Sequence, residues 1–383
     1  MTPTLSTVSG PASSRYRWLL HVDLDQFQVS VERLRSPELL DVAVIVGGNG
    51  DPTEARKVVT CASYEARDVG VRAGMPLRSA FRKMPDAVYL PTDIPFYDAA
   101  SADVMGVLRS FGHPVEVWGP DEAYIGVGEL DSTPAGTTPA DAQPSEQAVL
   151  DLAADIRSAV ATRCGLGCSV GVSDNKQRAK MATGFAKKRR SEDKVFLLDA
   201  RNWLDLMGGR PCRDLWSVGP KTAQKLTSHG ANTVNDLIGT PREDLIGIFG
   251  PHQGNWLYVL CRGGGDSTIT TQPWTAKSHS KSRTYPTDMT DGAEIRSAAE
   301  QLTRELIDQI VDEGRVVFRV AVTVRTSTFY TRTTSRTLEA STTNYDDVVP
   351  VVVELLERFE PDRAVRLLGV RCDLVDPEPD EQK

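Results

Sequence analysis

Two acidic clusters interrupt otherwise apolar, strand-like segments of this sequence. The first is Asp23-Leu24-Asp25 and the second is Asp121-Glu122. A buried, unpaired carboxylate is costly, so several that converge on one sheet edge need a cation to neutralise them. Oxygen ligands suit Mg²⁺ or Mn²⁺, and Mg²⁺ usually shares its coordination shell with substrate phosphates. The clusters together indicate a metal site for nucleotide chemistry, although either string alone also fits a solvated loop or helix end.

The composition is that of a globular protein with more than one domain. The chain has 383 residues, of which 40% are hydrophobic, and such a length suits roughly two to four domains. The chain contains no apolar run of the roughly 20 residues that a membrane span needs, and no basic segment followed by an apolar core at its start. We therefore expect a cytoplasmic protein that does not cross a membrane.

The six cysteines lack the paired spacing of a disulfide framework or a zinc site. Cys164 and Cys168 form the one close pair, and neither a second pair nor a nearby histidine accompanies them. A lone pair of this kind is weak support for a metal. The sequence therefore predicts buried, reduced thiols.

The net charge of −8 argues against a uniformly basic surface, but the positive charges are concentrated. Residues 187–190 form a basic run, for which a solvated surface is an equal alternative. A looser basic field follows at Lys277, Lys281, Arg283, Arg315, Arg319, Arg325, Arg332 and Arg336. Local binding of nucleic acid thus remains open.

Strands and helices must position the acidic clusters, and hydrophobic periodicity predicts where these elements lie in the sequence. After a disordered leader at 1–15, we expect strands at 18–22, 42–46 and 58–62 and helices at 27–34, 64–67, 76–83 and 97–111. A hairpin at 115–118 and 123–127 carries the second acidic cluster at its turn. A loop at 132–144 then precedes a helix at 146–164, a strand at 168–173 and a helix at 176–187.

The last part of the chain changes to short helices joined by glycine. Two helices around 215–226 flank Val218-Gly219-Pro220, and such a turn exposes backbone N–H groups to a phosphate, although an ordinary helical hairpin is the alternative. A flexible tether then precedes a β-helix-β-β-helix-β segment at 278–374. This order suits a small α/β sandwich whose open sheet face carries the basic field.

Six ordered motifs now resemble those of the Y-family, the translesion DNA polymerases, in the DinB or DNA polymerase IV branch. They are DLDQFQVSVE at 23–32, YEAR at 64–67, DEAY at 121–124, SVGVSDNK at 169–176 with AKMA at 179–182, VGPKT at 218–222, and VRLLGVR at 365–371. The resemblance covers the chain from about Trp18 to Leu374.

The resemblance implies a multidomain α/β (α+β) fold shaped like a right hand. It places a ferredoxin-like palm at 16–26 and 93–187, small fingers at 27–92, and a helical thumb with a helix-hairpin-helix at 188–263. A linker at 264–277 leads to an α/β little finger at 278–375, and an acidic tail follows at 376–383.

The resemblance also implies an active site for template-directed DNA synthesis. Asp23, Asp121 and Glu122 would hold two Mg²⁺ ions, which Mn²⁺ can replace, with help from the Leu24 carbonyl. One ion lowers the pKa of the primer 3′-hydroxyl and the other binds the triphosphate and the leaving pyrophosphate. The expected partners are primer-template DNA and a nucleoside triphosphate, and the expected protein is a monomer associated with the nucleoid.

Further residues follow by motif position. Tyr64, Arg67 and Lys180 match positions that hold the incoming triphosphate, with structural ion pairs as the alternative role. Phe27, Gln28 and Cys61 belong to the same nucleotide site. The residues expected to contact DNA are Val218, Gly219, Lys221 and Thr222 in the thumb, and Lys277, Lys281, Arg283, Arg332 and Arg336 in or beside the little finger.

The sequence departs from the family pattern in three places. Gln28 stands where the family usually has a Tyr or Phe that excludes a 2′-hydroxyl by steric clash, so we expect weak ribose discrimination and possible use of rNTP. Gly119-Pro120 replaces Ser-Ile before Asp121, and Cys61 replaces a Thr that commonly contacts the triphosphate. These changes predict a slower enzyme without removing a metal ligand.

Two other functions remain open from the sequence. One is a catalytically weak, polymerase-like accessory protein in DNA damage tolerance. The other is a nucleotide cyclase, whose palm-like sheet also uses two metals but which lacks a thumb and a little finger. The segment after Leu374 contains no hydrophobic clamp-binding peptide, so recruitment by a sliding clamp is unassigned and low processivity is expected.

Overall fold

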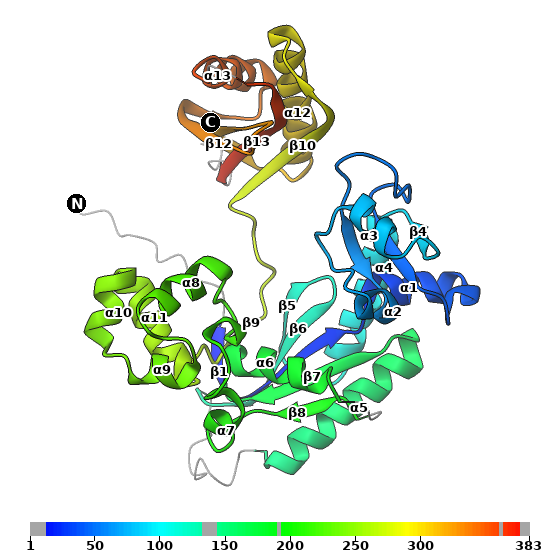
Figure 1. Ribbon diagram of the computed structural model, residues 1–383, viewed down its shortest axis with the longest axis vertical. Coiled ribbons are helices and arrows are strands. Elements are labelled where there is room, and N and C mark those ends of the chain that lie inside the picture. The colour runs from blue at the N-terminus through cyan, green and yellow to red at the C-terminus, as the bar shows by residue number, and fades with distance from the viewer. Residues whose placement is uncertain (1–12, 132–143, 190–192, 360–362, 376–383) are drawn as a thin grey trace, which may run out of the picture. The chain divides into compact units, whose positions relative to one another are not determined.

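The computed structural model describes residues 13–131, 144–189, 193–359 and 363–375 (Figure 1). The described chain divides into two compact units. The first contains most of the chain up to Pro273, and the second begins at Trp274 and also includes the short segments 53–57 and 76–78. No helix in the described ranges is long and apolar enough to cross a membrane. All six cysteines are free, as expected.

The first unit is built around a six-stranded sheet with β1 at its centre. Along the sheet the order is β5-β6-β1-β7-β8, with β9 beside the first residues of β1. Neighbouring strands are antiparallel except for β7 and β8. Their bounds are Ser13–Leu24 for β1, Val115–Gly119 for β5, Glu122–Glu129 for β6, Cys168–Ser173 for β7, Val195–Leu197 for β8 and Thr268–Thr270 for β9.

The two faces of this sheet are covered differently because successive side chains of a strand alternate between faces. Leu20 and Val22 of β1 join the large core that includes α4 (Ile94–Arg109) and α5 (Glu146–Cys164). Leu19 lies on the other face, in a small cluster with Ala179 of α6 (Lys176–Ala186). Odd-numbered residues of β1 therefore face α6.

Gly171 of β7 allows α6 to pack closely against the sheet. A Cβ atom at this position would overlap the backbone of Ala179 and the backbone nitrogen of Thr183, both on α6. We expect Gly171→Ala to lower the free energy of unfolding by about 3 kcal/mol or more, because α6 would have to move away from β7 and lose its packing against the sheet. Urea denaturation would measure the loss.

Gly184, on the same helix, is the matched control. An added Cβ there meets no atom within 4 Å, and alanine is the better helix former by about 1 kcal/mol. Gly184→Ala should therefore be neutral or stabilising. Equal destabilisation by both variants would contradict the close packing of α6 on β7.

A second, three-stranded sheet lies between β1 and β5 in the sequence. Its order is β3-β2-β4, with β2 antiparallel to β3 and parallel to β4. Short helices accompany it. The bounds are Phe27–Arg35 for α1, Val44–Gly47 for β2, Val59–Ala62 for β3, Tyr64–Asp68 for α2, Leu77–Lys83 for α3 and Val88–Leu90 for β4, and a single 3₁₀ turn covers Pro37–Leu39.

The last part of the first unit is a helical layer with its own core. Trp203, Leu215, Leu237 and Leu257 are among the buried residues that hold it together. Its helices are α7 (Trp203–Met207), α8 (Pro220–Ser228), α9 (Val234–Gly239), α10 (Arg242–Phe249) and α11 (Pro251–Cys261), with a 3₁₀ turn at Cys212–Asp214.

The second unit is a four-stranded antiparallel sheet with two helices on one face. The strand order is β10-β13-β11-β12. Residues from α12 and α13 share its core with even-numbered residues of β11 and β13, such as Val322 and Val370. The bounds are Ser278–Met289 for β10, Gly292–Asp312 for α12, Val316–Thr326 for β11, Thr331–Thr342 for β12, Tyr345–Glu357 for α13 and Val365–Val375 for β13.

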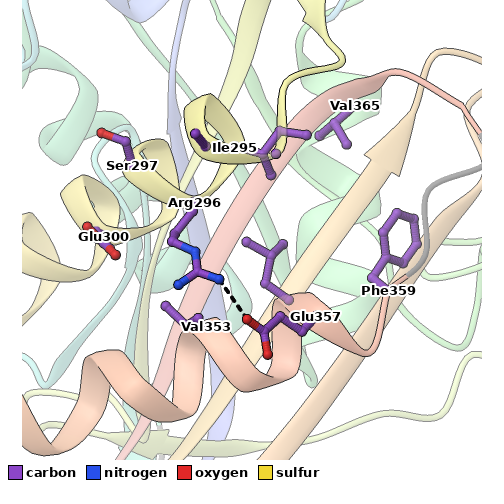
Figure 2. Close-up of a pocket in the computed structure, with 11 residues that line it drawn as sticks. Ile295, Arg296, Ser297, Glu300, Val353, Glu357, Phe359 and Val365 are labelled. Atoms are coloured by element: carbon purple, nitrogen blue, oxygen red, sulfur yellow. Dashed lines mark hydrogen bonds and ion pairs between the residues drawn. The ribbon is translucent and has the colours of Figure 1, made fainter.

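A pocket of about 560 Å³ opens between the start of α12 and the end of α13 (Figure 2). Ile295, Phe359 and Val365 give it apolar walls. The guanidinium of Arg296 donates to Glu357 at 2.7 Å and joins the two helices at the pocket.

Two expectations about flexible segments need correction. Residues 13–15, assigned to the leader, form the start of β1 and pair with β9 and, through Arg15, with Leu130. The tether expected from Gly263 to Ala276 contains β9, so its first part is bound to the main sheet. The rest of the leader, nearly all of the loop expected at 132–144 and the acidic tail lie outside the described ranges.

Candidate active site

The two acidic clusters meet on adjacent strands. Asp23 of β1 lies directly opposite Glu122 of β6 in the antiparallel register. The backbone N–H of Leu24 donates to the carbonyl of Asp121 at 2.8 Å, which fixes the turn that carries Asp121 against the end of β1. The three carboxylates expected to bind metal thus come from neighbouring positions at one end of the sheet.

Glu122 is held by two basic groups. Its Oε2 atom contacts Nε2 of His21 at 3.2 Å and also accepts from the ammonium of Lys180. The hydrogen bond from His21, followed by that from Lys180, lowers the pKa of Glu122 to about 2. His21 is fully buried, and Oγ1 of Thr183 lies 2.8 Å from its Nδ1. Burial lowers the pKa of His21, so its ring favours the neutral form.

The other two carboxylates are in different environments. Oδ1 of Asp23 accepts from the ammonium of Lys187 at 2.5 Å. Burial, and then the negative charges of Asp23 and Glu122, raise the pKa of Asp121. The end of the sheet therefore holds three mutually repelling carboxylates and two lysines that offset part of their charge.

This donor set fits a divalent metal. Carboxylates and a backbone carbonyl are the ligands that Mg²⁺ and Mn²⁺ prefer. Burial, and then repulsion from Asp23 and Glu122, raise the pKa of Asp121, and a bound cation would offset both effects. Within the described ranges, no three Asp, Glu, His or Cys side chains already converge as a metal-binding group. Asp23 and Glu122 point instead to Lys187 and Lys180.

Helix α6 supplies the basic partners by simple periodicity. Lys180, Thr183 and Lys187 are spaced i, i+3 and i+7, so they share the face of α6 and its C-terminal cap that lies over the odd-numbered residues of β1. The side chain of Asn175 caps the helix by accepting from the N–H of Arg178. Sequence reasoning identified Lys180 but gave no site role to His21 or Lys187. Alternation along β1 puts His21 on the same face as Asp23, and the helical spacing puts Lys187 on the same face as Lys180.

Gln28 lies on the first turns of α1, where its side chain meets a threonine from β3. The Oγ1 atom of Thr60 donates to Oε1 of Gln28 at 2.7 Å, and Oγ1 of Thr92 is 3.3 Å from that of Thr60. Phe27, one residue earlier, is 4% exposed and packs edge-on against Tyr97. Any contact of Phe27 with a nucleotide is therefore restricted to its backbone.

The expected triphosphate residues of the second sheet lie together. The guanidinium of Arg67 is 5.4 Å from the ring centre of Tyr64, donates to the carbonyl of Ala62 at 2.8 Å and contacts Sγ of Cys61 at 4.0 Å. Cys61 is buried, so it contributes little polar surface. Asp25, unlike Asp23, is buried among hydrogen-bond donors, one of which is the hydroxyl of Tyr64.

The thumb motif forms a helix N-terminus without a side-chain cap. Gly219 is the N-cap residue of α8 and Pro220 occupies its first turn. Ser217 has a positive φ of 75° and Val218 is buried, which fixes the turn. Lys221 is exposed and Thr222 half-buried at this end of α8, and Thr222 accepts a hydrogen bond from Gln253. The geometry suits a phosphate at the backbone N–H groups.

The expected location of the basic field on the open sheet face is wrong for several of its residues. Arg283 of β10 pairs with Glu305 of α12, and Arg336 of β12 pairs with Glu354 of α13, so both lie on the helix side. Strand alternation puts Lys281 and Arg332 on that side as well, and Lys277 lies just before β10.

The open face instead carries hydroxyls and three arginines. Arg319 donates to Ser335, Arg325 donates to Thr331, and Thr323 bonds Thr333 across the same face. Arg371 occupies the β13 position that is paired with Ala321 of β11, and so faces the same way. Asp373 offsets part of this charge through its ion pairs with Arg319 and Arg371.

Comparison with known proteins identifies the family. Residues 22–184 match the impB/mucB/samB family, 276–383 match the C-terminal domain of that family, and 213–264 match a domain described as the thumb of DNA polymerase-iota. The chain is 50% identical over 358 residues to DNA polymerase IV 2 of Mycobacterium tuberculosis, covering 94% of this chain and 98% of the relative. It is 32% identical over 360 residues to DNA polymerase IV of Methanoculleus marisnigri, covering 94% and 95%.

The chain belongs to the Y-family of DNA polymerases, in its DNA polymerase IV branch. Its enzyme class is therefore DNA-directed DNA polymerase. The fold agrees, since a Y-family chimera of Dbh and Dpo4 superposes with a TM-score of 0.79 at 22% identity, covering 94% of this chain and all of the other. DinB from Sulfolobus solfataricus gives 0.59 at 23% identity, covering the same shares. Membership of the Y-family removes the nucleotide cyclase alternative, and the right-hand fold with a helical thumb is confirmed.

Proposed function

We propose that this Y-family member extends a DNA primer by transferring a nucleotide from a triphosphate to the primer 3′-hydroxyl, with Asp23, Asp121 and Glu122 as ligands of two Mg²⁺ ions. The observation that carries the proposal is the register that sets Asp23 opposite Glu122, with Asp121 hydrogen-bonded to Leu24. Bound there, the ions would activate the 3′-hydroxyl and neutralise charge on the triphosphate. The carbonyl of Leu24 would be a further ligand.

Lys180 and Lys187 would change partners when substrate binds. Each ammonium now neutralises a proposed metal ligand, Glu122 or Asp23. A divalent ion would take over that neutralisation, and the released ammonium groups would lie beside the triphosphate. Lys180 would then act with Arg67 and Tyr64, which approach from the second sheet, to hold the phosphates by charge and hydrogen bonds.

The proposed weak ribose discrimination follows from how Gln28 is held. A Tyr or Phe would place a rigid ring at this position, whereas the Gln28 amide is narrower and is oriented by Thr60. With Oε1 occupied by the Thr60 hydroxyl, the NH₂ group of Gln28 is left to donate to a sugar hydroxyl. A 2′-hydroxyl would therefore meet a hydrogen-bond partner instead of a steric barrier.

DNA binding would be shared between the α8 N-terminus and the open face of the second unit. The amides after Gly219, with Lys221, suit a backbone phosphate. On the second unit the open-face arginines replace the helix-side residues first assigned. Binding through phosphate contacts carries no sequence preference and weakens as salt rises. A monomeric enzyme held by a few such contacts would dissociate readily, so we expect low processivity. We assign no segment of this chain to binding a sliding clamp.

Arg325 offers a direct test of the open face. Arg325→Ala should weaken binding to primer-template DNA about threefold to tenfold, because one phosphate contact is lost. For the same reason the slope of log K for DNA binding against log salt concentration should fall in magnitude by about 1. The matched control is Arg283→Ala, on the helix side and paired with Glu305, which should leave both quantities nearly unchanged. Fluorescence anisotropy at several salt concentrations measures them. The opposite ranking would favour the helix-side residues.

Primer extension tests the proposed function as a whole. A labelled primer annealed to a template should be extended in Mg²⁺ or Mn²⁺, only by nucleotides complementary to the template, and should stop when EDTA is added. Product length at excess unlabelled DNA reports processivity, which should be a few nucleotides at most. No extension with dNTP or rNTP in either metal would favour a catalytically weak accessory protein.

A further inference from the structure

Asp25 is the acidic residue of the first cluster that the proposed metal site does not use. It follows the last residue of β1 and its backbone is fixed on both sides. Its N–H donates to the carbonyl of Gly167 at 2.9 Å, and its carbonyl accepts from Oγ of Ser30 at 2.7 Å. The residue is 7% exposed. The backbone of Asp25 is therefore fixed and its side chain is buried.

Three donors from separate segments surround the Asp25 carboxylate. Oδ1 accepts from the hydroxyl of Tyr64 at 3.1 Å and from Oγ of Ser169 at 3.0 Å. Oδ2 accepts from the ammonium of Lys194 at 2.7 Å. These bonds use three of the roughly four acceptor positions of a carboxylate. Asp25 is thus compensated by the protein itself and, unlike Asp121, does not require a metal ion.

Two of the donors are anchored to the main sheet, and the third is not. Ser169 belongs to β7, and the carbonyl of Lys194 accepts from the N–H of Val170 on the same strand. Tyr64 begins α2, beside the second sheet. The Asp25–Tyr64 hydrogen bond therefore joins the sheet of the metal site to the segment that carries Tyr64 and Arg67.

Two consecutive residues, Asp25 and Gln26, hold Tyr64 at its hydroxyl and at its backbone. Its backbone N–H donates to Oε1 of Gln26 at 2.7 Å while its hydroxyl donates to Asp25. Gln26 itself has a positive φ of 43°, a conformation that is uncommon for a residue other than glycine. Two cations are close to the ring, with the Arg67 guanidinium 5.4 Å and the Lys194 ammonium 5.6 Å from its centre.

We propose that Asp25 is a positioning residue that orients Tyr64, and through it the neighbouring Arg67, toward the incoming triphosphate, and that it does not bind metal. The inference rests on the proposed roles of Tyr64 and Arg67. It assigns the two aspartates of one motif to different tasks: Asp23 faces the metal site and Asp25 sets the geometry of the nucleotide site.

Steady-state kinetics on the full chain with saturating primer-template separates these tasks. Asp25→Ala should raise KM for the correct dNTP about tenfold while kcat stays within about threefold, since one oriented hydrogen bond to the nucleotide site is lost. The Mg²⁺ concentration for half-maximal activity should not move. Asp25→Asn keeps the volume and one acceptor oxygen, so it should fold and raise KM by a smaller factor.

Tyr64→Phe provides the second arm. It removes only the hydroxyl and should raise KM to a similar extent, and the double variant with Asp25→Ala should be no worse than the stronger single variant because both remove the same interaction. Ser169→Ala is the matched control, since Ser169 donates to the same oxygen of Asp25 without touching Tyr64. It should leave KM unchanged.

Three other outcomes would each contradict a different part of the proposal. A higher Mg²⁺ requirement in Asp25→Asn, or a kcat as low as that of Asp23→Ala, would make Asp25 a metal ligand. A raised KM in Tyr64→Phe with normal KM in both Asp25 variants would overturn the positioning role alone. A normal KM in Tyr64→Phe would overturn the proposed nucleotide contact of Tyr64, and the role of Asp25 with it.

Discussion

Asp121→Ala will lower the rate of primer extension by roughly 10³-fold or more and will leave binding of primer-template DNA nearly unchanged. The carboxylate of Asp121 lies beside Asp23 and Glu122 and carries a raised pKa because of burial and those two charges. The negative charge of such a carboxylate is unfavourable in the metal-free protein and becomes favourable when a divalent ion binds to it. Its removal should therefore affect the loaded site far more than the fold.

The measurement is single-turnover extension in Mg²⁺, with DNA affinity and thermal unfolding recorded on the same protein samples. Asp131→Ala is the matched control, because Asp131 lies just past the far end of β6, is exposed, and pairs with Arg15. That variant should extend the primer at the parent rate. If Asp121→Ala kept more than about a tenth of the activity, the proposed ligand set would be wrong.

Gln28→Phe should increase discrimination against ribonucleotides by about 100-fold or more. The expected reason is that a rigid ring at this position would clash with a 2′-hydroxyl, and a lost or gained clash changes selection by several kcal/mol. The change also removes the hydrogen bond with Thr60. The ratio of kcat/KM for a dNTP to that for the matching rNTP, on one primer-template, measures the effect.

Gln28→Leu separates the two causes. Leucine is flexible and similar in size to glutamine but cannot form a hydrogen bond, so it tests whether space alone admits the ribose. If space decides, Gln28→Leu should accept rNTP within about fivefold of the parent, because one hydrogen bond is worth only about 1 kcal/mol. Strong rejection of rNTP by the parent protein would contradict the expectation from Gln28.

The sequence predicts the central part of the site well because strand alternation and pairing are local rules. Apolar residues at even positions of β1 require Asp23 to lie on the opposite face, and the two acidic motifs stand at the ends of strands that pair. The long-range partners could not be predicted in this way. Lys187 and Lys194 follow in the chain long after β1, and only the packed sheet shows which aspartate each one meets.

The open face of the second unit shows the same limit. Alternation in β10 separates Lys281 and Arg283 from the neighbouring Ser280 and Ser282, but it does not indicate which of the two faces the helices cover. Which face is covered depends on how the sheet packs against α12, where Glu305 forms an ion pair with Arg283. The start of β1 was missed for a related reason, since Ser13-Ser14-Arg15 has no apolar pattern and becomes a strand only because β9 pairs with it.

The pairing of β9 with β1 has a consequence for how strongly the two proposed DNA-binding surfaces would act together. Residues 271–277 separate Thr270 of β9 from Ser278 of β10, and a chain segment of that length reaches at most about 25 Å. A short connection gives the second surface an effective concentration in the millimolar range once the first has bound. Freeing β9 would lengthen this connection and dilute the second surface, so under the proposed DNA-binding roles the pairing of β9 would help to set the lifetime of the complex on DNA.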